Sequence, residues 1–171
     1  MNNALYFIGV LPNHEIRNEI TGFKNYAAEN FKTRHALNSP PHITLVPPFK
    51  MKAEKEKEML KSIIDLMPES QGVTVKLDGF GAFKPRVIFI RPQKSTEMAA
   101  LRDLLYKGLA DQFTEIKYDT RPFHPHVTVA FRDLTVQEFH RAWKEFQGKL
   151  FTAEYCCTTV ALLKHNGKIW E

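Results

Sequence analysis

The sequence predicts a mixed fold of strands and helices, built as two similar halves that face each other across a cleft. Its 171 residues, 43% of them hydrophobic, suffice for one domain or for two small lobes that share a core. Residues 42–44 and 126–128 both read His-x-Thr, each within a short apolar run near proline. The order strand, helix, motif strand, helix, strand, strand also occurs twice along the chain.

The first half, residues 1–86, shows these elements as separate patterns. Strand-like runs are apolar or alternating and end near proline or glycine, whereas helical segments carry apolar residues every three or four positions. The strands are expected at 4–11, 42–46 and 73–77, and the helices at 14–31 and 54–67. Pro47 and Pro48 are expected to end the motif strand, and residues 79–85 to form a turn region.

The second half, residues 87–171, repeats the order. Its strands are expected at 87–90, 126–131, 151–157, 160–163 and 169–170, and its helices at 96–113 and 135–146. Helix-capping side chains precede three of the four helices, at Asn13, Ser95 and Thr135. The separation of 84 positions between His42 and His126 also relates Ala4 to Ile88. We therefore expect a diverged duplication whose halves do not fold independently.

The two motifs place the same kinds of side chain on one face of each strand. Because side chains alternate along a strand, His42 and Thr44 point one way and Ile43 points the other way, towards a core. The same alternation applies to His126 and Thr128. Two such strands facing each other would gather two imidazoles and two hydroxyls around one small space. Such a group can perform acid–base chemistry on a phosphodiester without a metal.

Charge and composition narrow the class of protein. The formal net charge is +5 and the pI about 9.2, which suits an anionic substrate without identifying it. No apolar run approaches the roughly 20 residues that span a bilayer, and residues 1–3 carry no basic leader. Cys156 and Cys157 are neighbours that would point apart on a strand, so we expect two reduced thiols. These features predict a cytoplasmic protein with no membrane association.

Taken together, the two motifs resemble those of the 2H phosphoesterase superfamily, in particular its 2′-5′ RNA ligase-like (LigT-like) members. Residues 121–130, Arg-Pro-Phe-His-Pro-His-Val-Thr-Val-Ala, are especially similar to the second motif of that group. The strand at 4–11 and the region 162–167 also resemble its first and late strands. The resemblance implies an α+β bilobal fold over a single domain, residues 1–171. Two pseudo-symmetric antiparallel-sheet lobes with outer helices would flank a central groove.

The resemblance also implies an activity, which is hydrolysis of 2′,3′-cyclic phosphates or related diesters and, in some members, 2′-5′ ligation. It implies no metal and no cofactor. We expect His42 and His126 to be the acid–base pair, and Thr44 and Thr128 to bind the phosphate oxygens. The expected partner is an RNA end or a small nucleotide that carries a cyclic phosphate. The sequence leaves open the exact substrate, the choice between hydrolysis and ligation, which histidine is the base, and the oligomeric state.

Three further residues are predicted to contact the substrate: His124, Arg121 and Phe49. His124 is an extra histidine that departs from the family pattern. Alternation puts it on the face of His126, unless Pro125 takes it out of the strand at the edge. Other histidines, among them His35 and His165, are predicted to be surface residues.

Two rival functions stay open. A metal-dependent hydrolase would use His42, His124 and His126 as ligands, although neither motif has a nearby carboxylate and threonine is a poor zinc ligand. A non-catalytic RNA- or nucleotide-binding module would account for the basic charge and the aromatic content without a histidine pair. Turnover in the presence of EDTA would separate the two-histidine enzyme from both rivals.

Overall fold

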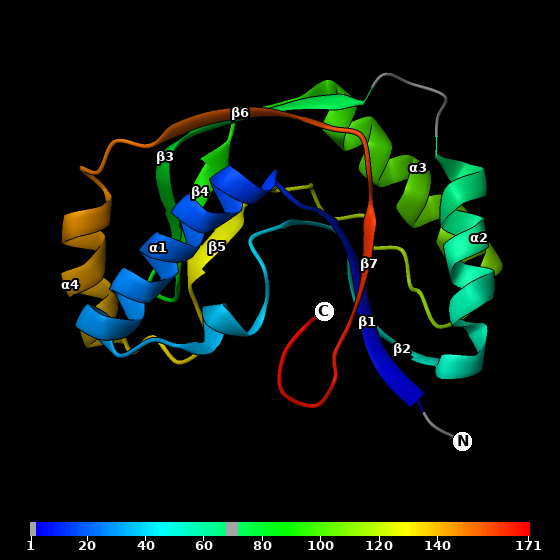
Figure 1. Ribbon diagram of the computed structural model, residues 1–171, viewed down its shortest axis with the longest axis horizontal. Helices are drawn as coiled ribbons and strands as arrows, with labels where there is room; N and C mark the ends of the chain where they lie inside the picture. The colour runs from blue at the N-terminus through cyan, green and yellow to red at the C-terminus, as the bar shows by residue number, and fades with distance from the viewer. Residues whose placement is uncertain (1–2, 68–71) are drawn as a thin grey trace.

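The computed structural model describes residues 3–67 and 72–171, and Figure 1 shows how their elements are arranged. The strands are β1 (Asn3–Val10), β2 (Ile43–Lys52), β3 (Val73–Phe83), β4 (Val87–Pro92), β5 (Val127–Ala130), β6 (Thr152–Cys157) and β7 (Ala161–Lys164). The α-helices are α1 (His14–Phe31), α2 (Glu56–Leu66), α3 (Thr96–Gln112) and α4 (Val136–Phe146), and the 3-10 helices are η1 (His35–Asn38) and η2 (Ala53–Lys55). The predicted α+β class is confirmed.

Helices α1, α3 and α4 begin where the sequence predicts, because each predicted capping side chain accepts a backbone N–H of the first turn, whereas α2 begins at Glu56, two residues late, after η2. The acceptor–donor pairs are Asn13 Oδ1 with Ile16 N at 3.0 Å, Ser95 Oγ with Met98 N at 3.0 Å, and Thr135 Oγ1 with Glu138 N at 3.2 Å. None of the described helices combines the length and apolarity that crossing a bilayer demands.

The seven strands form one antiparallel sheet in the order β6-β3-β4-β5-β2-β1-β7. We call β7, β1 and β2 the first lobe, and β5, β4, β3 and β6 the second lobe. The two lobes join between the motif strands, where β2 and β5 share a single residue pair, Ile43 with Val127. The two predicted lobes are therefore continuous at their centre, and the two motif strands are direct neighbours.

Each lobe takes strands from both halves of the sequence. Strand β3 pairs with β4 and β6, whereas β7 pairs with β1. The helices also cross between halves, because α1 packs against β5 and α4, and α3 packs against β2 and α2. In Figure 1, α1 and α4 accordingly lie beside the second lobe on the left, and α2 and α3 lie beside the first lobe on the right. Apolar side chains from both lobes belong to one continuous core.

The motif strands pair with the first strand of their own half in equivalent registers. Gly9 of β1 lies opposite Thr44, and Phe89 of β4 lies opposite Thr128. The burial pattern is also identical over the four residues that begin each motif strand, with only the threonine less than fully buried. The internal duplication is thus visible in strand pairing and burial as well as in sequence.

Both motif strands also carry an irregularity at the same place. The register shifts between Ile8 and Gly9 in the first lobe, and between Ile88 and Phe89 in the second. These positions make Ile8 the counterpart of Ile88. The sequence-based match of Ala4 with Ile88 is therefore wrong by four positions, because the segments between strand and motif differ in length.

Strand β2 continues beyond the predicted end at Pro47 and Pro48 as far as Lys52. Tyr6 pairs with Phe49 and Ile8 with Val46, so the two prolines lie opposite the single intervening residue of β1. This is a β-bulge, where a residue without a backbone N–H is tolerated because the ladder is already interrupted. The prolines therefore bend the strand without ending it.

Two other predicted boundaries also move. Strand β3 passes through the predicted turn region to Phe83, and the turn itself occupies 84–86. Gly81 permits this course, because a Cβ at that position would lie 2.6 Å from the ring of Phe89. The predicted strand at 169–170 is only an isolated bridge between His165 and Trp170, closed by Gly167 with φ of +101°.

Gly9 and Gly22 provide a matched test of this strand packing. A Cβ on Gly9 would lie 2.7 Å from the carbonyl oxygen of Ile43, whereas a Cβ on Gly22, in α1, would meet nothing within 4 Å. Gly9→Ala should therefore destabilise the protein by about 1–3 kcal/mol, and Gly22→Ala should stabilise it by about 1 kcal/mol. Urea unfolding measures both, and equal effects of the two substitutions would contradict this account.

Candidate active site

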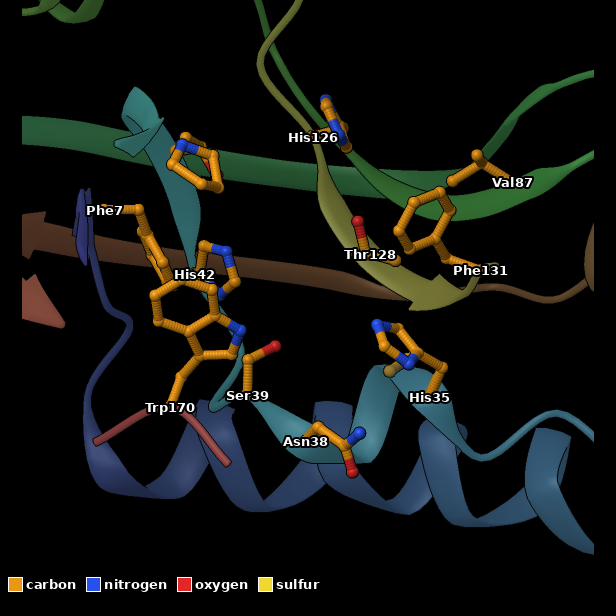
Figure 2. A pocket seen from close by; sticks show the side chains of 13 residues that line it. Phe7, His35, Asn38, Ser39, His42, Val87, His126, Thr128, Phe131 and Trp170 are labelled. Atoms are coloured by element: carbon orange, nitrogen blue, oxygen red, sulfur yellow. The ribbon is translucent and has the colours of Figure 1, made fainter. Parts of the chain in front are cut away.

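The four motif side chains meet in one cavity of about 240 Å³ between the lobes. His42 directly precedes β2 and His126 directly precedes β5, while Thr44 and Thr128 are the second residues of these strands. Figure 2 shows His42, His126 and Thr128 around the cavity. The single pair that joins β2 to β5 brings these strand ends together. The other lining residues are Phe7, His35, Ala36, Asn38, Ser39, Pro48, Val87, Phe131 and Trp170.

Both imidazoles are held by the same hydrogen bond. His42 Nδ1 lies 2.6 Å from the carbonyl oxygen of Pro40, and His126 Nδ1 lies 2.7 Å from that of His124. Because a carbonyl oxygen only accepts hydrogen bonds, Nδ1 must carry the proton in each ring. In the neutral ring this leaves Nε2 as an acceptor for a ligand in the cavity. Each half of the chain thus provides one pre-oriented base.

Burial makes both rings harder to protonate. It lowers the pKa of His42 to about 4, against the favourable bond to Pro40, and the charge of Lys24 lowers it further. Burial also lowers the pKa of His126, again opposed by the bond to the His124 carbonyl. Both rings are therefore neutral at pH 7. An anionic ligand between them would favour the protonated form of either ring.

Aromatic side chains supply much of this burial. The ring centroid of Phe7 lies 4.5 Å from that of His42, while Phe83 and Phe89 lie 5.1 and 5.4 Å from His126. These neighbours remove water from one side of each imidazole and fix its plane. They come from β1 and β4, which flank the motif strands, and from β3, which lies beyond β4.

A short segment closes the cavity on the side of α1, and we call residues 33–39 the strap. The second half of the strap is held through its carbonyl groups by Lys24, a residue that is only 2% exposed. Lys24 Nζ donates to the carbonyl oxygens of Ala36 and Ser39, both at 2.9 Å. Burial lowers the pKa of Lys24 to about 8, so the ammonium is largely charged at pH 7. The bonded Ser39 carbonyl directly precedes Pro40, the residue that orients His42.

The first three residues of the strap are held by Asp133, which follows β5 in the chain. Asp133 accepts hydrogen bonds from the Thr33 hydroxyl at 2.7 Å and from the backbone N–H groups of Arg34 and His35 at 2.8 and 3.0 Å. A third anchor is the N–H of Trp170, which donates to the Asn38 carbonyl at 2.7 Å. The strap is thus fixed to both halves of the chain and to its end.

The cavity wall is uncharged at pH 7. Its described lining contains no lysine, arginine, aspartate or glutamate, although the chain as a whole carries a net charge of +5. The polar side-chain groups of the described lining are therefore hydroxyls, an amide, imidazoles and the indole N–H of Trp170. Such a wall can hold one negative charge through neutral hydrogen-bond donors, but offers no fixed cation to a second.

The structure places three predicted substrate contacts elsewhere. Phe49 is 6% exposed and packs in the core, with its ring 6.0 Å from that of Tyr6, its partner in β1. Arg121 and His124 line a separate hollow, where Arg121 Nε donates to Asp119 at 2.7 Å. His124 contributes its backbone carbonyl to the site instead of its ring.

These positions also bear on the metal-site alternative. His124 does not line the cavity of His42 and His126, and the described residues contain no group of three histidine, cysteine, aspartate or glutamate side chains placed to hold a metal ion. The predicted three-histidine cluster is therefore not assembled.

Sequence reasoning missed several residues that build the site. His35, predicted to lie on the surface, lines the cavity, and so do Phe7 and Trp170. Lys24 gave one signal, since it stands on the apolar face of α1, four residues after Ile20. Asp133 gave none, because its partners lie about one hundred positions away in the chain.

Lys24→Met tests the link between the strap and His42. Removal of the buried charge should raise the pKa of His42, while the pKa of His126, which lies outside the reach of Lys24, should stay unchanged. NMR titration of the two imidazoles measures both values. Lys57→Met on the exposed face of α2 is the control, and a parallel change in both histidines would contradict a local effect.

Comparison with known proteins independently supports the family that the two motifs resemble. The family model described as the 2′-5′ RNA ligase superfamily matches residues 12–169. A provisionally named phosphoesterase of Geobacillus sp. strain WCH70 is 29% identical over 137 residues, which cover 78% of this chain and 72% of that protein. A second, from Geobacillus kaustophilus, is 27% identical and covers 83% of this chain and 77% of its own.

Solved structures show the same fold. Escherichia coli LigT complexed with 3′-AMP superimposes with a TM-score of 0.68 at 25% identity, over 95% of this chain and 88% of that one. TT0787 of Thermus thermophilus gives a TM-score of 0.66 at 20% identity, over 93% and 87% of the two chains. With the family model matching nearly the whole chain, the protein belongs to the 2′-5′ RNA ligase superfamily of 2H phosphoesterases.

Proposed function

We propose that this protein is a metal-independent phosphodiesterase that opens 2′,3′-cyclic phosphates, or cleaves 2′-5′ linkages, on RNA ends or small nucleotides. The observation that carries the proposal is the paired arrangement of the motif side chains. Two neutral imidazoles of the same tautomer share one cavity, and each stands two residues from a threonine hydroxyl. Such a pair can accept a proton on one side of a phosphate and donate one on the other.

The reaction follows from these positions. One Nε2 removes a proton from water as its oxygen forms a bond to phosphorus, and the other ring, in its protonated form, donates a proton to the ribose oxygen as its bond to phosphorus breaks. Thr44 and Thr128 donate hydrogen bonds to the non-bridging oxygens, where negative charge accumulates. The product is a phosphomonoester, and solvent restores both rings. A ribose hydroxyl in place of water would give the reverse 2′-5′ ligation.

We assign His42 as the base and His126 as the acid for the hydrolytic direction. His42 is the ring whose pKa is lowered to about 4, with burial as the main cause and the nearby Lys24 charge as a further one. A ring held neutral in this way is ready to accept a proton. No lysine or arginine contributes to the lowered pKa of His126. The one charged neighbour that lowers it is His124.

The uncharged wall supports a diester as the substrate. A diester carries one negative charge, whereas a monoester carries nearly two at pH 7. The described cavity lining offers neutral donors and no fixed cation, so the diester fits its electrostatics better than the monoester. The same difference favours release of the product. Nucleotides are the favoured class, because LigT of Escherichia coli was crystallised with 3′-AMP, which carries its phosphate on the ribose.

Replacement of the motif side chains tests the catalytic assignment. With nucleoside 2′,3′-cyclic phosphates and a 2′-5′ linked dinucleotide in EDTA, His42→Ala and His126→Ala should each lower kcat by about 10²- to 10⁴-fold. Thr44→Val and Thr128→Val should lower it by about 10- to 10³-fold. His14→Ala, on the exposed start of α1, is the control that should keep full activity.

Three results would count against the proposal. Full activity of His42→Ala would exclude that ring, and loss of wild-type activity in EDTA would restore a metal mechanism. Absence of turnover, combined with salt-sensitive RNA binding that the double histidine variant retains, would favour a non-catalytic binding module.

The lowered pKa values predict an acidic optimum for kcat/KM, which reports the free enzyme. Activity should rise as pH increases through about 4, where His42 becomes neutral. It should fall at higher pH as His126 loses its proton, and this happens below pH 6.5 because the pKa of His126 is lowered. The optimum should therefore lie between about pH 4 and 6.5. A kcat/KM profile from pH 4 to 9 measures it, and a maximum above pH 7.5 would contradict the assignment.

A further inference from the structure

One corner of the cavity is aromatic and has no part in the chemistry described above. It is formed by His35, from the strap, and Phe131, which directly follows β5. Their ring centroids lie 6.0 Å apart, with an angle of 70° between the ring planes. Figure 2 shows both rings on the Thr128 side of the cavity, away from Phe7 and Trp170, which lie beside His42.

Phe131 is unusual because its ring is 41% exposed although it lines a cavity. At the opposite end, Phe7 has little free surface and Trp170 is partly buried. Phe7 is 3% exposed and packs against both His42 and Trp170, with centroid distances of 4.5 and 4.7 Å. Phe131 is therefore the aromatic residue of this lining with the highest exposed fraction, and a ligand in the cavity can cover it.

The corner is built as a fixed unit. Asp133, two residues after Phe131, accepts the backbone N–H of His35 at 3.0 Å and that of Arg34 at 2.8 Å. The same carboxylate accepts the hydroxyl of Thr33, which is almost fully buried. One side chain therefore holds the two rings in place relative to each other, which reduces the entropy lost when a ligand binds.

The chemistry of the corner fits a flat, uncharged ring with polar edges. None of the described cavity-lining side chains is a lysine, arginine or carboxylate, and burial, with the nearby Arg132 charge, lowers the pKa of His35 so that its ring is neutral. A neutral imidazole edge can donate or accept one hydrogen bond. A nucleobase has this combination of a stacking face and hydrogen-bonding edges.

We propose that the corner of His35 and Phe131 binds the nucleobase of the substrate, with the base stacked on the Phe131 ring. The inference rests on the proposed function, because the phosphate must sit between the two motif histidines. It adds that the base itself is bound at this corner, so that a ribose cyclic phosphate without a base is a poor substrate. Stacking of one base on an aromatic side chain contributes about 5- to 150-fold in affinity.

Substrate truncation combined with mutation tests this. The two substrates are adenosine 2′,3′-cyclic phosphate and the 2′,3′-cyclic phosphate of methyl riboside, which has no base. Phe131→Ala should lower kcat/KM for the adenosine substrate by about 5- to 150-fold and leave that for methyl riboside unchanged. Phe131→Trp, which keeps a stacking surface, should retain the preference for adenosine.

Phe83→Ala is the matched control. The Phe83 ring is 42% exposed, about the same as Phe131, but lies outside the cavity and against His126. Its loss should change kcat/KM for both substrates by the same factor. If Phe131→Ala behaves in the same way, or has no effect on either substrate, the inference is overturned. A base preference removed by Trp170→Leu instead would place the base at the opposite end and also overturn it.

A binding measurement separates this inference from the proposed function. Calorimetry with adenosine 2′,3′-cyclic phosphate, at a pH where turnover is negligible or with His126→Ala, reports the subsite without catalysis. Phe131→Ala should weaken binding in that background by about 5- to 150-fold, even if the wild-type protein hydrolyses neither substrate. Unchanged binding would overturn the base subsite, whatever the fate of the catalytic proposal.

Discussion

The site depends on the contact between β2 and β5, where one residue pair joins the two lobes. Ile43 and Val127 are both fully buried and lie opposite each other, each flanked by a histidine and a threonine. Antiparallel pairing at this point means that the two motifs run in opposite directions past the same space. The local two-fold relation between the imidazoles is therefore a consequence of backbone pairing, and any shift of register here would separate them.

Burial then turns two ordinary histidines into matched groups. Each ring gives its Nδ1 proton to a carbonyl two residues earlier in the chain, and each is covered by phenylalanine. The halves differ at equivalent positions, because Gly9 faces Thr44 where Phe89 faces Thr128. In the first half the covering ring comes from Phe7 instead. The two histidines thus have similar hydrogen bonds but different surroundings, which suits two different roles.

The sequence predicts well those features that depend on residues close together in the chain. The caps at Asn13, Ser95 and Thr135 and the strand alternation around His42 depend on neighbours within a few residues, so pattern alone identifies them. The bulge at Pro47 and Pro48 is invisible to alternation, and it lets β2 continue to Lys52.

The strap and the residues that anchor it could not be predicted from the sequence pattern. Lys24, Asp133 and Trp170 act through partners that only the folded chain brings near. His35 lies in a polar segment that resembles any surface loop until those anchors are known. The histidine pair was thus accessible from sequence, and the walls of its cavity were not.

The exchange of strands and helices between the halves has a consequence for how the chain can be divided. A polypeptide ending near residue 86 would contain β3 without β4 and β6, and α1 without β5, the strand against which it packs. The remaining piece would contain β7 without β1. Neither fragment carries a complete lobe, so each would present bare sheet edges and apolar helix faces that only the other covers. Division of the chain at its midpoint would therefore remove strand partners from both lobes at once and not one lobe alone.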